Sequence, residues 1–262
     1  MTSKSDITPY LRRNLKTRYM GKQAHYFPVT TSTMDEARKL AEQGSPQGTI
    51  AIAGKQETGR GRMGRSWLSP EGGLATSIIL RPPEKALRLL PAIASVAVYR
   101  TISRMGIKAS IKWPNDILIS GKKICGILIE NGFSAGNLVY SITGIGINVN
   151  FETTRFPEIA DIATSLSVEL GREVSIAEVA LNLYSEMEML YDRIGEPDFI
   201  MDEWTRHMGT IGRRVGVNTG GSTLEGIAEA VNPVGNLVLR LDDGSIYEVV
   251  AGDVSNVRDK TK

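Results

Sequence analysis

The stretch from Glu57 to Trp67, ETGRGRMGRSW, restricts the fold of this chain more than any other. Its three glycines follow the spacing G-x-G-x-x-G, which in dinucleotide-binding folds joins a strand to a helix. An apolar run at 49–54, TIAIAG, precedes it and predicts the strand. The next segment, SPEGG at 69–73, cannot continue into a helix because it contains a proline and two glycines. A dinucleotide-binding fold is therefore not predicted, and the chain contains no Walker sequence either.

A run of glycine and arginine can also be a disordered tract that binds RNA, but such tracts lie outside a folded core. This run is short and lies between two predicted strands, 49–54 and 74–81, so it is tethered at both ends. We interpret it as a disorder-prone flap that closes over an anionic ligand, with its glycines as hinges. A loop that is merely solvated and mobile is the alternative. The side chains expected to meet the ligand are Arg60, Arg62, Arg65 and Trp67.

Composition places the chain among ordinary globular proteins. Of its 262 residues 41% are hydrophobic and 23% are charged, and the net charge of +2 does not favour nucleic acid or an acidic membrane. The single cysteine, Cys125, excludes an intrachain disulfide and favours a reducing cytoplasm. No apolar run approaches the length of a membrane span, and the N-terminus has no signal-peptide core. We therefore expect a cytoplasmic protein that does not enter a membrane.

The N-terminal residues 1–20 form a basic arm. The first 22 residues contain six lysines and arginines and one acidic residue, Asp6. Such a segment is most often a solvated leader, and we interpret it in this way.

Hydrophobic periodicity and turn residues predict an α+β fold, with a mixed or antiparallel sheet and helices on one face. A first domain is expected over 21–209, and short strand-like runs after Gly209 predict a small antiparallel barrel over 210–262. The turns expected between strands are at Ser120-Gly121 and at SAGN, 134–137. The predicted helices are 33–43, 84–105, 175–193 and 199–208, and the further predicted strands are 109–113, 123–131 and 138–150.

A second group of polar residues lies in KWPNDILISGKKICG, 112–126. Asn115 and Asp116 stand where one predicted strand ends, and side chains of this type can hold a nucleotide with Mg²⁺. Lys123 follows after a turn and can reach a negatively charged reacting centre. In TGIGINVN, 143–150, two glycines interrupt an apolar strand, which indicates close approach of a ligand or of another part of the protein.

Four segments occur in one order: TSTMDEA, KQETGRGRMGRSW, KWPNDILISGKKICG and GIGINVN. Together they resemble the biotin protein ligases, over nearly the whole chain. The resemblance implies a class II synthetase-like core followed by an SH3-like barrel. It also implies an enzyme that activates biotin with ATP and Mg²⁺ to biotinyl-5'-AMP. Such an enzyme then transfers biotin to a lysine of a biotin carboxyl carrier domain, as in acetyl-CoA carboxylase.

The resemblance also implies roles for individual residues. One position departs from the family, because Met34 stands where the motif Ser-Thr-Asn has its asparagine, and a thioether cannot donate a hydrogen bond. The expected catalytic groups are Arg60, Lys123 and Asp116, with Asp116 also near Mg²⁺. The expected ATP contacts are Arg62, Arg65, Trp67, Asn115 and Asp116. The expected biotin contacts are Ser32, Thr33, Met34, Gln56, Gly59, Arg60, Gly61, Arg62, Lys123 and Gly144.

Three alternatives remain open at this point. A lipoate–protein ligase would use the same chemistry on a related fold, and a ligase-like protein could bind biotin without catalysis. A DNA-binding repressor is the third, but the basic arm is too short to replace a helix-turn-helix, so we expect no sequence-specific DNA binding. Family members often form dimers, and a homodimer of this chain is therefore an open expectation.

Overall fold

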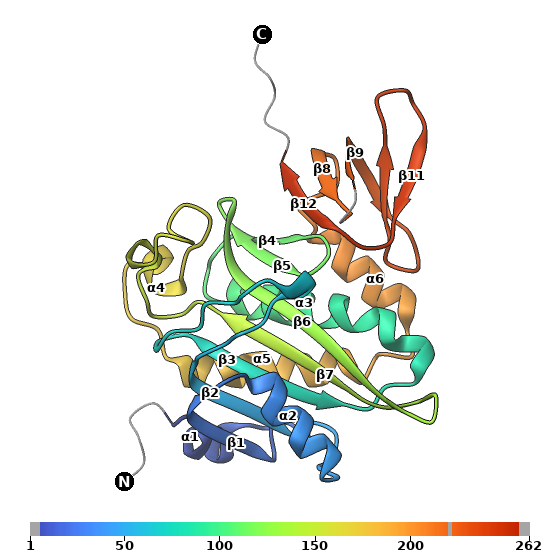
Figure 1. The fold of residues 1–262 in the computed structure, drawn as a ribbon. Coiled ribbons are helices and arrows are strands. Elements are labelled where there is room, and N and C mark those ends of the chain that lie inside the picture. Colours follow the sequence, from blue (N-terminus) through green and yellow to red (C-terminus); the bar gives the residue numbers. More distant parts are fainter. Residues whose placement is uncertain (1–5, 220–221, 257–262) are drawn as a thin grey trace.

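The computed structural model of the protein describes residues 6–219 and 222–256, which form two separate sheets (Figure 1). The first sheet has seven strands in the order β1-β2-β3-β7-β6-β5-β4. Its β1 and β2 are parallel, and all other neighbours are antiparallel, so the expected mixed sheet is confirmed. The strands are β1 (Ala24–Thr30), β2 (Ile50–Gln56), β3 (Leu74–Leu80), β4 (Ala109–Lys112), β5 (Asp116–Ile119), β6 (Lys122–Ser134) and β7 (Asn137–Ile147).

The strands β1 and β5 are the elements of this sheet that the sequence analysis did not predict, and β5 shows why. Only four residues long, it lies between the turn residues Pro114-Asn115 and Ser120-Gly121, so its flanks hid it. The predicted turn is correct, because Ser120 and Gly121 have φ angles of 50° and 82° and join β5 to β6. The turn at 134–137 is correct as well, with Ala135 at φ 49° and Gly136 at φ 80°.

Helices cover both faces of this sheet (Figure 1). Along β2, Ile50 and Ile52 face the main core with α3 and α5, whereas Ala51 belongs to the cluster under α2. The expectation that the helices share one face therefore holds for α3 and α5 and is wrong for α2. The helices are α1 (Thr8–Asn14), α2 (Thr33–Glu42), α3 (Leu90–Ser103), α4 (Leu166–Leu170), α5 (Ile176–Tyr191) and α6 (Pro197–Arg206).

The predicted helix 84–105 is present in two parts. Its first part, Glu84–Leu89, is a 3₁₀ helix, and α3 begins at Leu90, where Pro91 occupies the first turn. Contrary to the sequence expectation, Glu84–Ser103 is long and apolar enough by composition to cross a membrane. Of its apolar window 67% is buried inside the protein, which is typical of a core helix rather than a membrane span.

The N-terminal segment is packed rather than solvated from residue 8 onward, so the interpretation of a solvated leader is wrong for this part. Leu11 and Met20 are fully buried, and Leu15 is nearly so. The carboxylate of Glu188 on α5 accepts hydrogen bonds from three successive backbone N–H groups, those of residues 18–20, at 2.7–2.9 Å. The sequence signal was the apolar spacing within the basic arm, which its positive charge obscured.

The second sheet is antiparallel, with the order β11-β10-β9-β8-β12, as expected for the small C-terminal barrel. Its last strand was not predicted. The second sheet contacts the domain of the first sheet, since Trp113 Nε1 donates to the carbonyl of Gly235 at 3.0 Å. The strands are β8 (Arg214–Asn218), β9 (Thr223–Val231), β10 (Leu237–Arg240), β11 (Ile246–Val249) and β12 (Asp253–Asn256).

Candidate functional site

A cavity of about 220 Å³ lies on the face of the first sheet that carries α2. The pleat of β7 explains this placement: Ile145 and Ile147 point into the core, so Gly144 and Gly146 face the cavity. The cavity collects nearly all of the side chains that the sequence singled out. They are Ser32, Thr33, Met34, Gln56, Arg60, Gly61, Arg62, Arg65, Trp67, Asn115, Asp116, Lys123 and Gly144.

The sequence reasoning missed one wall of the cavity. Ile159, Ile162 and Ala163 line it from a segment after β7, and Ile162 is 64% exposed. The backbone of Lys123 holds this segment in place by donating to the carbonyl of Ile162 at 2.8 Å and accepting from the N–H of Thr164 at 3.0 Å. No motif marked this wall, and the exposed isoleucine could have been found only from the fold.

The flap is an ordered hairpin that crosses the sheet. Trp67 N–H donates to the carbonyl of Gly59 at 2.8 Å, and Gly61 N–H donates to the carbonyl of Arg65 at 2.7 Å. A Cβ on Gly59 would stand 2.4 Å from the carbonyl oxygen of Trp67, so this pairing requires glycine there. The tip turns at Met63 and Gly64, which have φ angles of 55° and 71°. In this structure the flap is therefore a formed hairpin, and its tendency to disorder stays a prediction.

The indole of Trp67 lies directly on the sheet. Gly126 of β6 and Gly146 of β7 are opposite each other in the register, and a Cβ on either would meet the indole at 2.8 Å or 2.4 Å. The ammonium of Lys123 is 5.3 Å from the ring centroid, within the range of a cation–π contact. Two glycines thus make the platform on which the flap tryptophan rests.

Gly144 is explained by a second side chain. The sulfur of Met34 would stand 2.5 Å from a Cβ on Gly144, and Met34 is only 4% exposed. The helix α2 carries Met34 in its first turn, and the hydroxyl of Ser32 caps this helix by accepting from Met34 N–H at 3.3 Å. Both glycines of TGIG are therefore required by protein side chains that line the cavity.

A chain of hydrogen bonds fixes Gln56 at one end of the cavity. Its Oε1 accepts from the backbone N–H of Thr33 at 2.8 Å and from the Thr33 hydroxyl at 3.1 Å, and Ser77 donates to that hydroxyl at 2.8 Å. This arrangement fixes which end of the amide is oxygen. The amide nitrogen donates no hydrogen bond within residues 6–219 and 222–256, so it is free to serve a ligand.

The opposite end of the cavity is cationic. Lys123 Nζ lies 2.7 Å from Asp116 Oδ1, and Lys112 Nζ lies 4.0 Å from the other oxygen. Arg62 donates to Asn115 Oδ1 at 2.9 Å, and burial lowers the pKa of its guanidinium. Among residues 6–219 and 222–256, Asp116 is the only acidic residue that lines the cavity. Positive charge therefore exceeds negative charge here, as a binding site for phosphate or carboxylate requires.

Two flap arginines are already paired with acids that the sequence reasoning did not select. Both terminal nitrogens of Arg60 lie 2.8 Å from the two oxygens of Asp35, and Arg65 lies 2.7 Å from Asp253 of β12. The hydrogen bonds between Arg60 and Asp35 raise the pKa of the guanidinium and lower that of the carboxyl. In the sequence Asp35 is only an acidic residue at the start of the helix predicted over 33–43, a place that acids favour without further function.

The fold and the site define a protein ligase of the biotin and lipoate class. The family model described as the biotin/lipoate A/B protein ligase family matches residues 26–148. The model of the biotin protein ligase C-terminal domain matches residues 210–256.

Individual relatives agree with this class. The bifunctional ligase/repressor BirA of Bacillus subtilis is 39% identical over 93% of this chain and 77% of its own length. The biotin–[acetyl-CoA-carboxylase] ligase of Paracoccus denitrificans is 31% identical over 80% of this chain and 91% of its own. The structure of a biotin protein ligase from Aquifex aeolicus with biotin and ATP matches with a TM-score of 0.76 at 31% identity, covering 89% and 98% of the two chains. The present chain belongs to the biotin protein ligase family.

Proposed function

We propose that the protein activates biotin with ATP to biotinyl-5'-AMP and transfers the biotinyl group to a lysine of a biotin carboxyl carrier domain. One observation carries the proposal: Arg62, Lys123 and Trp67 meet in one cavity with the fixed amide of Gln56. The cationic end suits a carboxylate and a phosphate together, and the end with the donor amide suits a ring with a polar carbonyl.

In the first step, a carboxylate oxygen of biotin attacks the α-phosphorus of ATP, and the bond from that phosphorus to pyrophosphate breaks. Two anions must approach, and the site lowers their repulsion by placing cations at the point of reaction. The ammonium of Lys123 is held in place by Asp116 at 2.7 Å and by the face of Trp67. Arg62 is held by Asn115 and has its remaining donors for phosphate oxygens.

The role expected for Arg60 changes with this geometry. Its guanidinium binds Asp35 with both terminal nitrogens and lies 3.5 Å from Glu130, so its charge is already compensated by carboxylates. We assign Arg60 to holding the flap, and Gly59 and Gly61 beside it to contacts through the backbone. The phosphate contacts of the flap then fall to Arg62, with Trp67 on the adenine side.

In the second step, the amine of the carrier lysine attacks the acyl carbon of biotinyl-5'-AMP, the bond to AMP breaks, and a proton leaves the amine. An unperturbed lysine has a pKa of about 10.4, so it must lose a proton to react. Asp116 is 8% exposed and supplies a carboxylate to the lining of the cavity, and we propose that it positions this amine. The closed flap would keep water from the anhydride between the two steps.

The family also implies Mg²⁺, and the residues present fit it in one way. No group of three metal-ligating side chains occurs within the part of the chain that the structure describes. Mg²⁺ in nucleotide enzymes is commonly held by one or two carboxylates together with phosphates and water. Asp116, with Asn115 beside it, would hold the ion, which would reduce the charge of the polyphosphate.

Exchange of labelled pyrophosphate into ATP tests the proposal, with biotin, with lipoate and with neither acid. We expect exchange that depends on biotin. Exchange that depends on lipoate alone would identify a lipoate ligase instead. If neither biotin nor lipoate supports exchange, the protein would be only a binding protein. Transfer of biotin to a purified carrier domain then tests the second step.

The proposal has three further parts. We propose that the protein acts in the cytoplasm, where the buried thiol of Cys125 stays reduced. We also propose a homodimer, which sedimentation would test against a monomer. We propose no operator-specific DNA binding, and tight sequence-selective binding at physiological salt would contradict this.

A further inference from the structure

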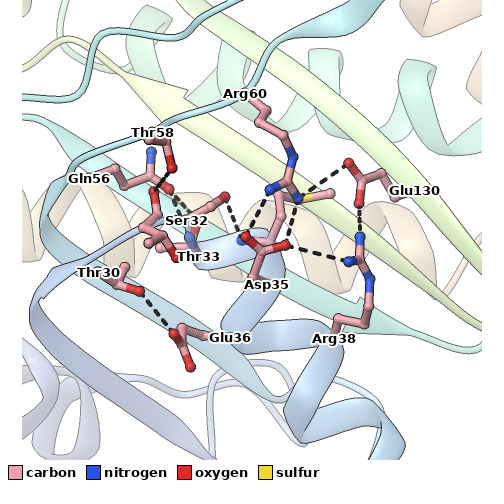
Figure 2. Close-up of polar contacts among 12 residues, drawn as sticks. Thr30, Ser32, Thr33, Asp35, Glu36, Arg38, Gln56, Thr58, Arg60 and Glu130 are labelled. Atoms are coloured by element: carbon pink, nitrogen blue, oxygen red, sulfur yellow. Dashed lines mark hydrogen bonds and ion pairs between the residues drawn. The ribbon is translucent and has the colours of Figure 1, made fainter. Parts of the chain in front are cut away.

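Four charged side chains form a network between the flap and the fixed part of the fold (Figure 2). Arg60 of the flap binds Asp35 of α2 with both terminal nitrogens, and one of them also lies 3.5 Å from Glu130 of β6. Arg38, one turn after Asp35, lies 2.5 Å from Glu130 and 3.4 Å from Asp35. Two guanidinium groups and two carboxylates thus alternate, and the network carries no net charge.

The two carboxylates belong to the packed core of the fold, whereas the arginine they bind belongs to the flap. Asp35 is in the first turn of α2, which packs on the sheet through buried residues on either side of it in the sequence, Met34 and Ala37. Glu130 lies within β6, paired with Ile142 of β7. Arg60 belongs to a hairpin in which, within the described part of the chain, its backbone pairs only with the return segment, at Ser66. The network therefore joins a movable element to a fixed one.

We propose that Asp35, supported by Glu130, is a positioning residue that holds the flap closed over the biotin end of the cavity through Arg60. The inference rests on the proposed function, because it assigns this contact to biotin binding. Gly61, which follows Arg60, lines the cavity directly, so opening the flap at this point removes part of the wall. The opening cannot occur without breaking both hydrogen bonds to Asp35.

The other two flap arginines hold different parts of the hairpin. Arg62 binds the neutral side chain of Asn115, and the pair of Arg65 and Asp253 has exposed fractions of 53% and 39%. Pairs as exposed as the second contribute little. The pair of Arg60 and Asp35 is less exposed, at 36% and 27%, and has two-point geometry, so it is the strongest of these contacts.

The substitution Asp35→Asn tests the proposal, because it keeps the size of the side chain and removes the charge. We expect the KM for biotin in pyrophosphate exchange to rise about five- to tenfold, since only the closed fraction of molecules binds well. The kcat should stay within about twofold, because the reacting groups are untouched. In the absence of biotin, a protease of broad specificity should also cleave the flap of Asp35→Asn faster than that of the unaltered protein.

Glu36→Gln is the matched control. Glu36 is the next acid in the same helical turn, but it binds Thr30 and Lys39 and not the flap. A general loss of negative charge at the start of α2 would affect both variants equally, whereas a contact that holds the flap closed predicts an effect for Asp35→Asn alone. Equal thermal unfolding temperatures of the two variants would show that both are folded.

The double variant Asp35→Asn with Arg60→Gln should bind biotin no more weakly than Arg60→Gln alone. Both substitutions remove the same contact, so the second has nothing further to remove. Additive effects, or an unchanged KM and cleavage rate in Asp35→Asn, would overturn the proposal. A fall in kcat at constant KM would also overturn it, by placing Asp35 in the chemistry. If the unaltered protein shows no biotin-dependent exchange, the proposed function fails, while the cleavage rates still decide whether the contact closes the flap.

Discussion

Replacing Gly146 with alanine should weaken ATP binding, because it puts a methyl group where the indole of Trp67 lies. The new Cβ would stand 2.4 Å from Nε1 of the indole and 2.6 Å from the adjacent ring carbon. Gly146 is in the middle of β7, paired with Ala75 on one side and Gly126 on the other, so the backbone cannot retreat. The flap side chain must move instead.

The size of the effect follows from the role that we propose for Trp67. Stacking of a nucleic acid base on an aromatic side chain contributes about 1–3 kcal/mol. Complete displacement of the indole should therefore raise the KM for ATP by about fivefold to about a hundredfold. Gly146 does not have a positive φ, so alanine fits its backbone conformation, and global stability should change little.

The assay is pyrophosphate exchange at saturating biotin, with ATP varied. Trp67→Ala and the double variant complete a cycle: without the indole, the methyl group at position 146 has nothing to strike, so the double variant should match Trp67→Ala. Gly195→Ala is the control, since a Cβ on Gly195 meets no atom within 4 Å. An unchanged KM for ATP in Gly146→Ala, or additive effects in the cycle, would refute the reasoning.

Three further predictions concern the cations, the pocket wall and the N-terminal segment. Lys123→Ala should lower the kcat of exchange by about a hundredfold to about a thousandfold. The control is Lys112→Ala, because Lys112 lies 4.0 Å from the same carboxylate, that of Asp116. A kcat of Lys123→Ala within about tenfold of that of the unaltered protein would count against the assignment. Met34→Asn should lower the KM for biotin if the amide regains a hydrogen bond to the ligand, and a higher KM would show that the thioether contributes by packing on Gly144. Glu188→Gln should lower the free energy of unfolding by about 2 kcal/mol, because it weakens three hydrogen bonds from backbone N–H groups. Burial pushes the pKa of Glu188 up but these hydrogen bonds outweigh it, so its pKa is lowered; the stabilisation is present above pH about 4.5 and disappears as pH falls through the lowered pKa, which urea titrations at pH 7 and pH 3 would measure in both proteins.

The sequence was sufficient for features that depend on neighbouring residues. The helix predicted from residue 175 does start there, and the Ser175 hydroxyl caps it by accepting from Glu178 N–H at 3.3 Å, because a cap is decided within four residues. Turn residues located the hairpins on both sides of β6 for the same reason. The strand β5 and the packed N-terminal segment were missed because their stability comes from distant partners, which no local pattern contains.

The candidate site shows the same division. Motif residues identified which side chains meet in the cavity, but not which of them are already paired. Asp35, Glu130 and Asp253 come from three separate elements, and each is an unremarkable surface acid in the sequence. Only the folded chain brings them to the flap, so the role of Arg60 could not be separated from that of Arg62 beforehand.

The charges of the flap determine how the three arginines divide their work. Arg60 and Arg65 each have a carboxylate within 2.8 Å, so at contact distance their charge is already compensated. Arg62 is the exception, because its partner is the neutral amide of Asn115 and, within residues 6–219 and 222–256, it forms no ion pair. Burial lowers its pKa, which means that its charged form is poorly solvated and gains most when an anion arrives. In a flap with three unpaired arginines, the guanidinium groups would repel one another and the cations of the cavity when the flap closes. Pairing two of them lets the hairpin close and leaves a single guanidinium, beside Lys123, to bind the ligand's negative charge.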